Sequence, residues 1–323
     1  MARRSWLMII VINSILGSLG CATTPYHYSR FHDEASSLEA RQAVRFEYGK
    51  PHRGLDRAAW IVALPSRILP FHPKVNSHKL SQETAEKLEH YLEANDLTDV
   101  LVRVNQYDPV GEWQRMRENS RIAFGWKYTF GTANWLGYTL IPSRVFGGDY
   151  YNPYSNSLSV NSDVPAILIT EAAYAKDIHS RALPGTYASI NQFPVLTLWR
   201  YTRAVNDSLG YARHQDDWDL ERETCATVFP MLGIQAALGG HTATGLVMVL
   251  PSITVPIAMI GGAVAGHTVG QTVIAKREHE IESRKSTRIP LNSSEAETGD
   301  SESKTQLVGF TESPPDEKPK RRP

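Results

Sequence analysis

The stretch AILITEAAYAKDIH, residues 166–179, decides which fold the sequence predicts. It is apolar over most of its length, and Pro165 stands directly before it. Proline suits the first turn of a helix, where its missing N–H costs no hydrogen bond. The sequence therefore predicts an apolar helix over these residues.

The stretches around this helix predict a mainly helical α+β chain. Residues 81–95 place Leu88 and Leu92 on one face of an amphipathic helix, with Ser81 as its N-cap. Two short segments alternate like strands, at residues 100–104 and 157–160. Further helices are expected over residues 112–120, over 194–208 and from about residue 216.

Aromatic residues gather in one segment, residues 125–145. They include Trp126, Phe130 and Trp135. Such residues favour strands. We expect strands or an aromatic surface here, serving either as core and edge packing or as a groove for a substrate or partner.

Five residues of the 166–179 helix line up with the zinc-peptidase motif H-E-x-x-H. In that motif two histidines one helical turn apart bind the metal, and the glutamate activates the metal-bound water. Here the five residues are Thr170, Glu171, Ala172, Ala173 and Tyr174. The general-base position is kept, and both ligand positions are lost.

The surroundings of these five residues resemble the gluzincin-type metallopeptidases. The stretch YNPYSNSLSV, residues 151–160, resembles the edge strand that binds substrate in that family. Glu223 and the following TCATVFPMLG resemble the third-ligand glutamate and its continuation in secreted and membrane-attached bacterial relatives. The stretch GHTVG at 266–270 is similar to a terminal feature of those relatives. The resemblance covers about residues 145–275.

The resemblance implies a gluzincin-like domain, mainly helical with a small edge sheet, whose metal site is vestigial. Glu171 would be a vestigial general base, and Thr170, Tyr174 and Glu223 would be vestigial metal-site positions. Threonine is a poor zinc ligand, and a tyrosine with a pKa near ~10 stays protonated. Two carboxylates alone offer too few donors, so we expect no metal and no cofactor. Their repulsion would be relieved by a proton, an arginine or hydrogen bonds.

An inactive relative of this kind, a pseudopeptidase, would act by binding or scaffolding. Its ligand would be a peptide or protein held in the inherited substrate groove. The candidate groove residues are Tyr151, Asn152, Ser157 and Val160.

Three other interpretations stay open. The five residues could belong to an ordinary core-facing helix. A displaced metal site could combine His179, His214 or Asp177 with Glu171 and Glu223. Serine catalysis is disfavoured because the chain contains no G-x-S-x-G sequence. The alternatives to a pseudopeptidase are therefore an active hydrolase with a non-standard site and a structural lipoprotein without peptidase ancestry.

The first residues read MARRSWLMIIVINSILGSLG and are typical of an export signal, with Arg3 and Arg4 before an apolar stretch. Cys21 follows directly. This order resembles a bacterial lipobox, although Ser18 stands where leucine is usual. The resemblance implies a lipidated Cys21 and a protein of the bacterial envelope; an ordinary cleaved signal or an uncleaved anchor is the alternative.

A long block, residues 224–275, contains no Asp, Glu, Lys or Arg. It includes the small-residue stripe Gly262, Gly266 and Gly270, whose spacing lets helices approach closely in a membrane. Residues 246–266 are long enough to cross the ~30 Å hydrocarbon core. We expect membrane contact by a single crossing or a helical hairpin; a buried soluble hairpin is the alternative.

Charge and composition complete the predicted organisation. The 34 basic and 34 acidic residues balance, which argues against nucleic acid as a partner. The predicted parts are a signal peptide (1–20), a tether (21–50), a degenerate peptidase-like domain (51–228), a hydrophobic membrane segment (229–275) and a disordered charged tail (276–323).

Overall fold

The computed structural model describes residues 25–28, 43–50, 54, 59, 68–70, 72–243 and 254–287. The predicted signal peptide, the lipidation site Cys21 and residues 288–323 of the predicted tail lie outside these residues. The chain divides into two compact units, Met1–Glu278 and His279–Pro323. All contacts below belong to the first unit.

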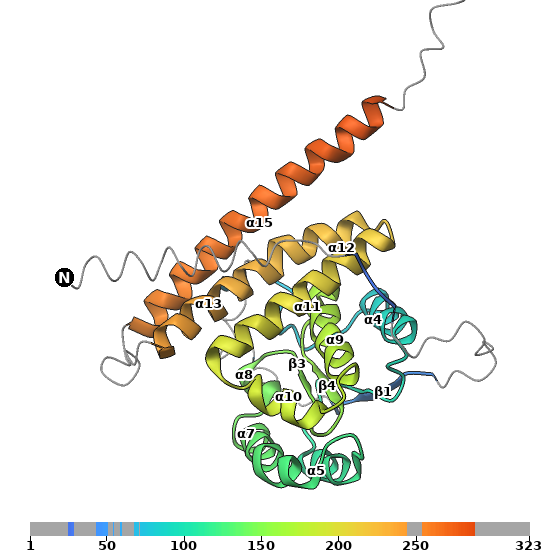
Figure 1. The fold of residues 1–323 in the computed structure, drawn as a ribbon, viewed down its shortest axis with the longest axis vertical. Helices are drawn as coiled ribbons and strands as arrows, with labels where there is room; N and C mark the ends of the chain where they lie inside the picture. The colour runs from blue at the N-terminus through green and yellow to red at the C-terminus, as the bar shows by residue number, and fades with distance from the viewer. Residues whose placement is uncertain are drawn as a thin grey trace, which may run out of the picture. The chain divides into compact units, whose positions relative to one another are not determined.

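A four-stranded mixed sheet with the order β1-β2-β4-β3 lies at the centre of the first unit (Figure 1). Its strands are β1 (Arg45–Tyr48), β2 (Leu101–Val104), β3 (Tyr150–Asn152) and β4 (Ser157–Val160). Strands β1, β2 and β4 run parallel, and β3 pairs antiparallel with β4 at the edge. The predicted strands at 100–104 and 157–160 are confirmed.

The two faces of the sheet differ in chemistry because side chains alternate along a strand. Val102 and Val104 of β2, with Leu158 and Val160 of β4, belong to the hydrophobic core. The opposite face carries Arg103, Ser157 and Ser159, which are also buried. One face is therefore apolar and the other polar, although both are covered.

The apolar core includes residues of helices α4 (Gln82–Ala94) and α9 (Pro165–His179). The oxygen of Ser81 caps α4 by accepting from the Thr84 N–H at 3.3 Å. An Asp163 oxygen accepts from the Ser81 N–H at 3.0 Å, which joins the starts of the two helices. Both predicted helices are confirmed, as is Pro165 in the first turn of α9.

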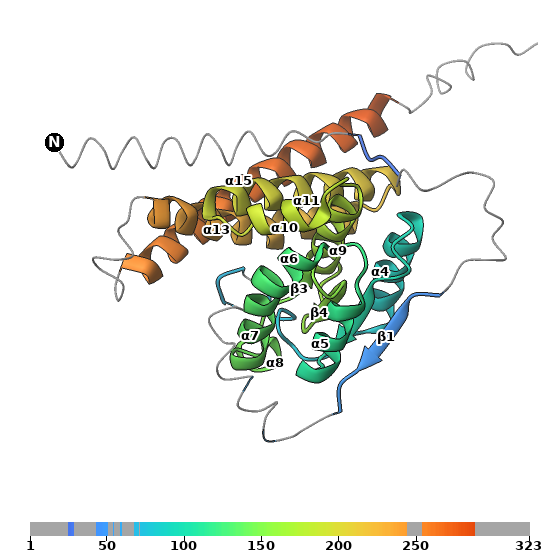
Figure 2. The same ribbon diagram turned by 60° about the horizontal axis from the view of Figure 1, so that its bottom comes forward.

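A group of shorter helices follows β2 in the chain, and Figure 2 shows α5, α7 and α8 on the side away from α13, with α6 close to α10. The group comprises α5 (Pro109–Glu118), α6 (Phe124–Trp126), the π-helical η2 (Lys127–Gly131), α7 (Thr132–Leu140) and α8 (Ser143–Phe146). The expectation of strands over 125–145 is wrong. Ring contacts such as Trp113–Trp135, at 4.9 Å between centroids, stabilise a helical packing that overrides the strand preference of aromatic residues.

Further helices follow α10 (Pro184–Ile190). They are α11 (Pro194–His214), α12 (Trp218–Glu223), the π-helical η3 (Thr224–Val228), α13 (Phe229–Ala243) and α15 (Thr254–Thr287). Helix α11 begins at the residue predicted and continues six residues beyond the predicted end at residue 208.

Helices α13 and α15 form an antiparallel hairpin held by close backbone contact. A Cβ on Gly262 would lie 2.4 Å from the Gly233 carbonyl oxygen, and one on Gly266 would lie 2.2 Å from that of Phe229. One on Gly270 would lie 2.1 Å from the oxygen of Cys225. The small-residue stripe therefore packs within the chain. Residues 244–253, which connect the two arms, lie outside the described residues.

Parts of the stretch predicted as a tether pack against the folded unit. Residues 45–48 form β1, and Tyr26 is buried against Tyr91 and Tyr211. A strand of four residues gives too short an alternation to stand out in the sequence.

Candidate functional site

The residues in the ligand positions of the peptidase-like motif point into the molecule from α9. Thr170, Glu171 and Tyr174 are all buried. The Thr170 hydroxyl donates to the Ala166 carbonyl at 2.7 Å, one turn earlier in the same helix. The side-chain hydroxyl of Thr170 is therefore hydrogen-bonded to the backbone of its own helix.

Glu171 lies beside the cation of Arg200, which comes from α11. Burial raises the pKa of Glu171, while the Arg200 charge and hydrogen bonds from the Tyr151 N–H and Tyr201 act in the opposite direction. The Tyr151 N–H lies 3.2 Å from Glu171 Oε2. This buried carboxylate therefore has a cation and donors from the protein itself.

Tyr174 completes this cluster. The Arg200 guanidinium lies over its ring, 4.1 Å from the centroid, and the Tyr151 ring meets it edge-on at 5.8 Å. Burial raises the pKa of Tyr174 to about 12, although Arg200 acts to lower it. The phenol is therefore protonated at neutral pH and is not a phenolate ligand.

Glu223 has different hydrogen-bond and charge partners from Glu171. Its Oε2 accepts from the Ala166 N–H at 3.0 Å in the first turn of α9, and its Oε1 lies 3.8 Å from His72 Nε2. Burial raises its pKa, against the Ala166 hydrogen bond and the charges of Lys87 and Lys74. A carboxylate at a helix N-terminus satisfies a free N–H and favours the helix dipole. The two glutamates thus have separate partner sets.

Metal-binding geometry is not found in the described part of the chain, where no group of three or more His, Cys, Asp or Glu side chains converges. The residues of the displaced-site interpretation have different neighbours. His179 contacts Asn156, His214 contacts Tyr28, and Asp177 pairs with Arg181. The structure does not bring them together.

The four predicted groove residues lie in β3 and β4 and are all buried. Tyr151 packs on the α9 side, where its hydroxyl donates to Asn156 at 2.7 Å. Asn152 and Ser157 point to the opposite face, and Val160 joins the apolar core. Their side chains are divided between the two faces of the sheet, and β3 is one of its two edge strands.

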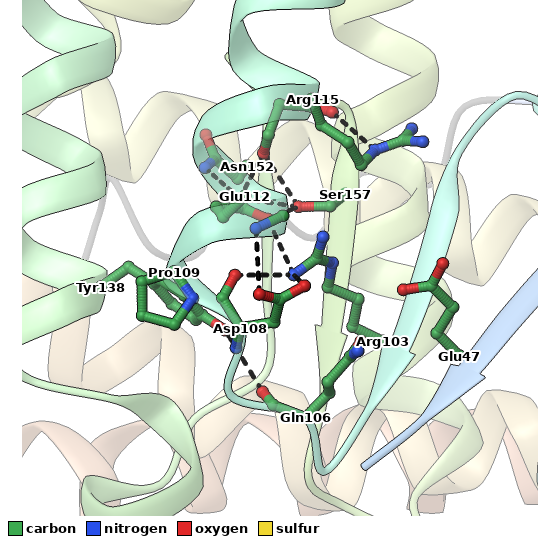
Figure 3. Close-up of polar contacts among 12 residues, drawn as sticks. Glu47, Arg103, Gln106, Asp108, Pro109, Glu112, Arg115, Tyr138, Asn152 and Ser157 are labelled. Carbon is green, nitrogen blue, oxygen red and sulfur yellow. Dashed lines mark hydrogen bonds and ion pairs between the residues drawn. The ribbon is translucent and has the colours of Figure 1, made fainter.

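A second polar cluster lies on the other face of the sheet, and the sequence prediction missed it (Figure 3). Glu112 of α5 accepts hydrogen bonds from Asn152 at 2.7 Å, from Ser157 at 2.9 Å and from Ser155. Arg103 of β2 lies opposite, with Nη1 at 3.6 Å from Glu112 Oε2. Both charged residues are only 2% exposed.

The cluster fastens α5 to the polar face of the sheet. Arg103 also donates to the Asp108 carbonyl at 3.2 Å, where α5 begins, and Arg115 donates to the Ser155 carbonyl at 3.2 Å. The buried Nε of Arg103 has no hydrogen-bond partner among the described residues. The signal in the sequence is a lone arginine within the apolar strand VLVRV.

His179, at the end of α9, is another buried titratable group near the site. Its Nε2 lies 3.0 Å from the Asn156 side-chain oxygen and 3.3 Å from the Tyr151 hydroxyl. Burial lowers its pKa to about 4, although the Asp99 charge acts to raise it. His179 is therefore neutral at pH 7.

Comparisons with known proteins add no relative to this description. No protein-family model, curated protein or solved structure matches the chain.

Proposed function

We propose that this protein is a catalytically inactive, gluzincin-like pseudopeptidase that acts by binding or scaffolding at the membrane of the bacterial envelope. The observation that carries the proposal is the placement of Arg200 beside Glu171 and over Tyr174. A protein cation stands next to the general-base position. Such a carboxylate is held by the fold and is poorly placed to activate a metal-bound water.

The engagement of the two ligand positions supports the same proposal. Thr170 is hydrogen-bonded within α9, and Tyr174 is a protonated phenol under a guanidinium. Neither offers a lone pair to zinc comparable with that of an imidazole. The lost histidines have been replaced by residues that pack.

Membrane association rests on the hydrophobic C-terminal part of the chain. Within the described residues, Val255–Arg284 is one helix long and apolar enough to cross a membrane. Together with the predicted export signal and Cys21, it supports attachment at the envelope.

A structural envelope lipoprotein without peptidase ancestry is the second candidate. The specific observation in its favour is that Glu223 accepts from Ala166 at the start of α9, whereas Glu171 accepts from Tyr151 of β3. In a site inherited from a zinc peptidase, the two carboxylates are expected to face one metal position.

Metal analysis tests the expected loss of the zinc site. Purified full-length protein, dialysed against zinc and then against buffer, is expected to retain no stoichiometric zinc. One tightly held zinc per chain would contradict the pseudopeptidase proposal.

A rescue experiment separates the two candidates. The variant Thr170→His/Tyr174→His, with Arg200→Ala to remove the cation, is expected to bind zinc if the geometry is inherited. Thr170→His/Arg200→Ala and Tyr174→His/Arg200→Ala are the controls, because one histidine is missing in each. A folded triple variant that binds no more zinc than these controls would favour the structural lipoprotein.

A further inference from the structure

The hairpin of α13 and α15 uses its small-residue stripe internally. Gly262, Gly266 and Gly270 all face the antiparallel partner segment, at distances that leave no room for a side chain. This stripe is therefore not available to bind a helix of another protein. The face of α15 opposite these glycines is the exposed face of the hairpin.

The exposed face of α15 is apolar at its beginning and polar further on. Ile257, Ile260 and Val264 are 63%, 56% and 51% exposed. Thr268 and Gln271, next along the same helical face, are exposed polar residues. The strongly apolar stretch from 257 to 264 is about 11 Å long at 1.5 Å per residue.

A second helix presents apolar side chains at the same end of the hairpin. Helix α11 packs along α13 and runs in the opposite direction, so its start lies near the end of α13 (Figures 1 and 2). At that start Phe193, Leu196 and Trp199 are exposed, Trp199 by 59%. Tryptophan favours the boundary between hydrocarbon and water.

Charged residues limit how deep this end could enter a bilayer. Arg203 follows Trp199 by one helical turn and is ion-paired with Asp177 at 3.0 Å. On α15, the exposed polar residues Thr268 and Gln271 follow directly after the apolar stretch. An apolar stretch of about 11 Å covers less than half of the ~30 Å hydrocarbon core.

From these observations we infer that the chain docks on a lipid bilayer monotopically, with the start of α15 and the start of α11 entering one leaflet. Ile257, Ile260 and Val264 enter the acyl region, and Phe193 and Trp199 lie at the interface. This inference rests on the membrane association proposed above and specifies its geometry. Both arms return to the folded unit, so no single helix crosses the bilayer.

Depth-dependent quenching tests the geometry on full-length protein carrying Cys21→Ser. Cysteines introduced as Ile260→Cys or Gln271→Cys are labelled with bimane, while the parent chain checks that buried Cys225 takes no label. Vesicles contain phosphatidylethanolamine, phosphatidylglycerol and lipids spin-labelled near the head group or near the chain end. We expect strong quenching at position 260 by the shallow label, weaker quenching by the deep label, and none at position 271.

Charge substitutions provide an independent readout. Ile260→Asp and Trp199→Asp are each expected to lower the vesicle partition coefficient at least about tenfold, because apolar area is no longer buried. Gln271→Asp on the same helix and Val110→Asp, an exposed apolar position on α5, are the matched controls and should bind like the parent.

The outcomes separate the inference from the proposed function. If the parent chain does not sediment with vesicles, the membrane association fails and the inference fails with it. If it sediments but position 260 is unquenched, or the four Asp variants bind alike, membrane association stands and this docking surface is wrong. Stronger quenching by the deep label, or labelling of Ile257→Cys by an impermeant maleimide inside sealed vesicles, shows a spanning hairpin and overturns the one-leaflet geometry.

Discussion

Two buried glutamates, Glu112 and Glu171, meet the same requirement on opposite faces of the sheet. A carboxylate removed from water needs a counter-charge or hydrogen-bond donors. Glu112 receives donors from Asn152 and Ser157 and lies opposite Arg103. Glu171 lies beside Arg200. In each case the partner lies on a different element, so the cluster joins elements as well as neutralising charge.

At the Glu112 cluster, loss of one charge is expected to cost more than loss of both. Glu112→Ala leaves the buried Arg103 without its carboxylate and should reduce the free energy of unfolding by about 3–5 kcal/mol. The double variant Arg103→Met/Glu112→Leu should recover part of that loss. Urea unfolding of these variants measures the difference.

Glu118→Ala, at an exposed position of the same helix, is the control and should change stability by less than about 0.5 kcal/mol. If Glu112→Ala and the double variant lowered the free energy of unfolding equally, the unpaired Arg103 charge would not be the cause of the loss.

At His179, the expected effect is a fall in stability on acidification. Its pKa is about 4 in the folded chain, against about 6.5 for an unperturbed histidine, so between these values the unfolded chain binds more protons. The free energy of unfolding should therefore decrease as the pH falls from 6.5 to 4, by about 3 kcal/mol. His179→Gln should abolish this part of the pH dependence.

The groups facing His179 are Asp99, which acts to raise its pKa, and Arg121, which acts to lower it. Denaturant unfolding at closely spaced pH values provides the measurement. A variant that keeps the same slope between pH 6.5 and 4 would assign the slope to other groups.

Among the elements, the hairpin of α13 and α15 depends on which glycine faces the partner. Gly262 faces the Gly233 carbonyl, whereas a Cβ on neighbouring Gly261 would meet nothing within 4 Å. Gly262→Ala should destabilise the protein by about 1–3 kcal/mol through overpacking. Gly261→Ala should stabilise it by about 0.5–1 kcal/mol, because alanine favours the helix.

The two variants add the same methyl group at neighbouring positions, so each serves as the control for the other. Thermal unfolding in a detergent or lipid-free buffer measures both. A similar change in melting temperature for the two would contradict the close packing of the arms.

Other elements were predictable to different degrees. Helices α4 and α9 follow from an N-cap and from a proline in the first turn, both of which are local signals. The prediction of strands over 125–145 was wrong because it relied on the average preference of aromatic residues for strands. There, contacts between rings on neighbouring helices decide the conformation.

For the molecule as a whole, Tyr26 joins the N-terminal part of the chain to three helices. Its ring contacts Tyr91 of α4 and Tyr211 of α11, and Lys176 of α9 lies 4.0 Å from its centroid. Tyr26→Ala should reduce the free energy of unfolding by about 3 kcal/mol, as for other buried aromatic residues.

Tyr48→Ala, at an exposed position of β1, is the control and should have little effect. Chemical denaturation compares the two. Equal small losses would mean that Pro25–Tyr28 packs on the surface without contributing to stability, as expected of a tether.

The sequence by itself determined the mainly helical α+β character, the starts of α4 and α9, two of the strands and the uncharged block. These features depend on neighbours within one or two turns or on alternation along a strand, and both are visible in the order of residues. Only the tertiary structure decided that Arg200 lies beside Glu171, that Glu223 caps α9, and that the glycine stripe packs against η3 and α13. Such pairings join residues far apart in the chain, and packing of the whole unit selects them from many alternatives of the same charge or size.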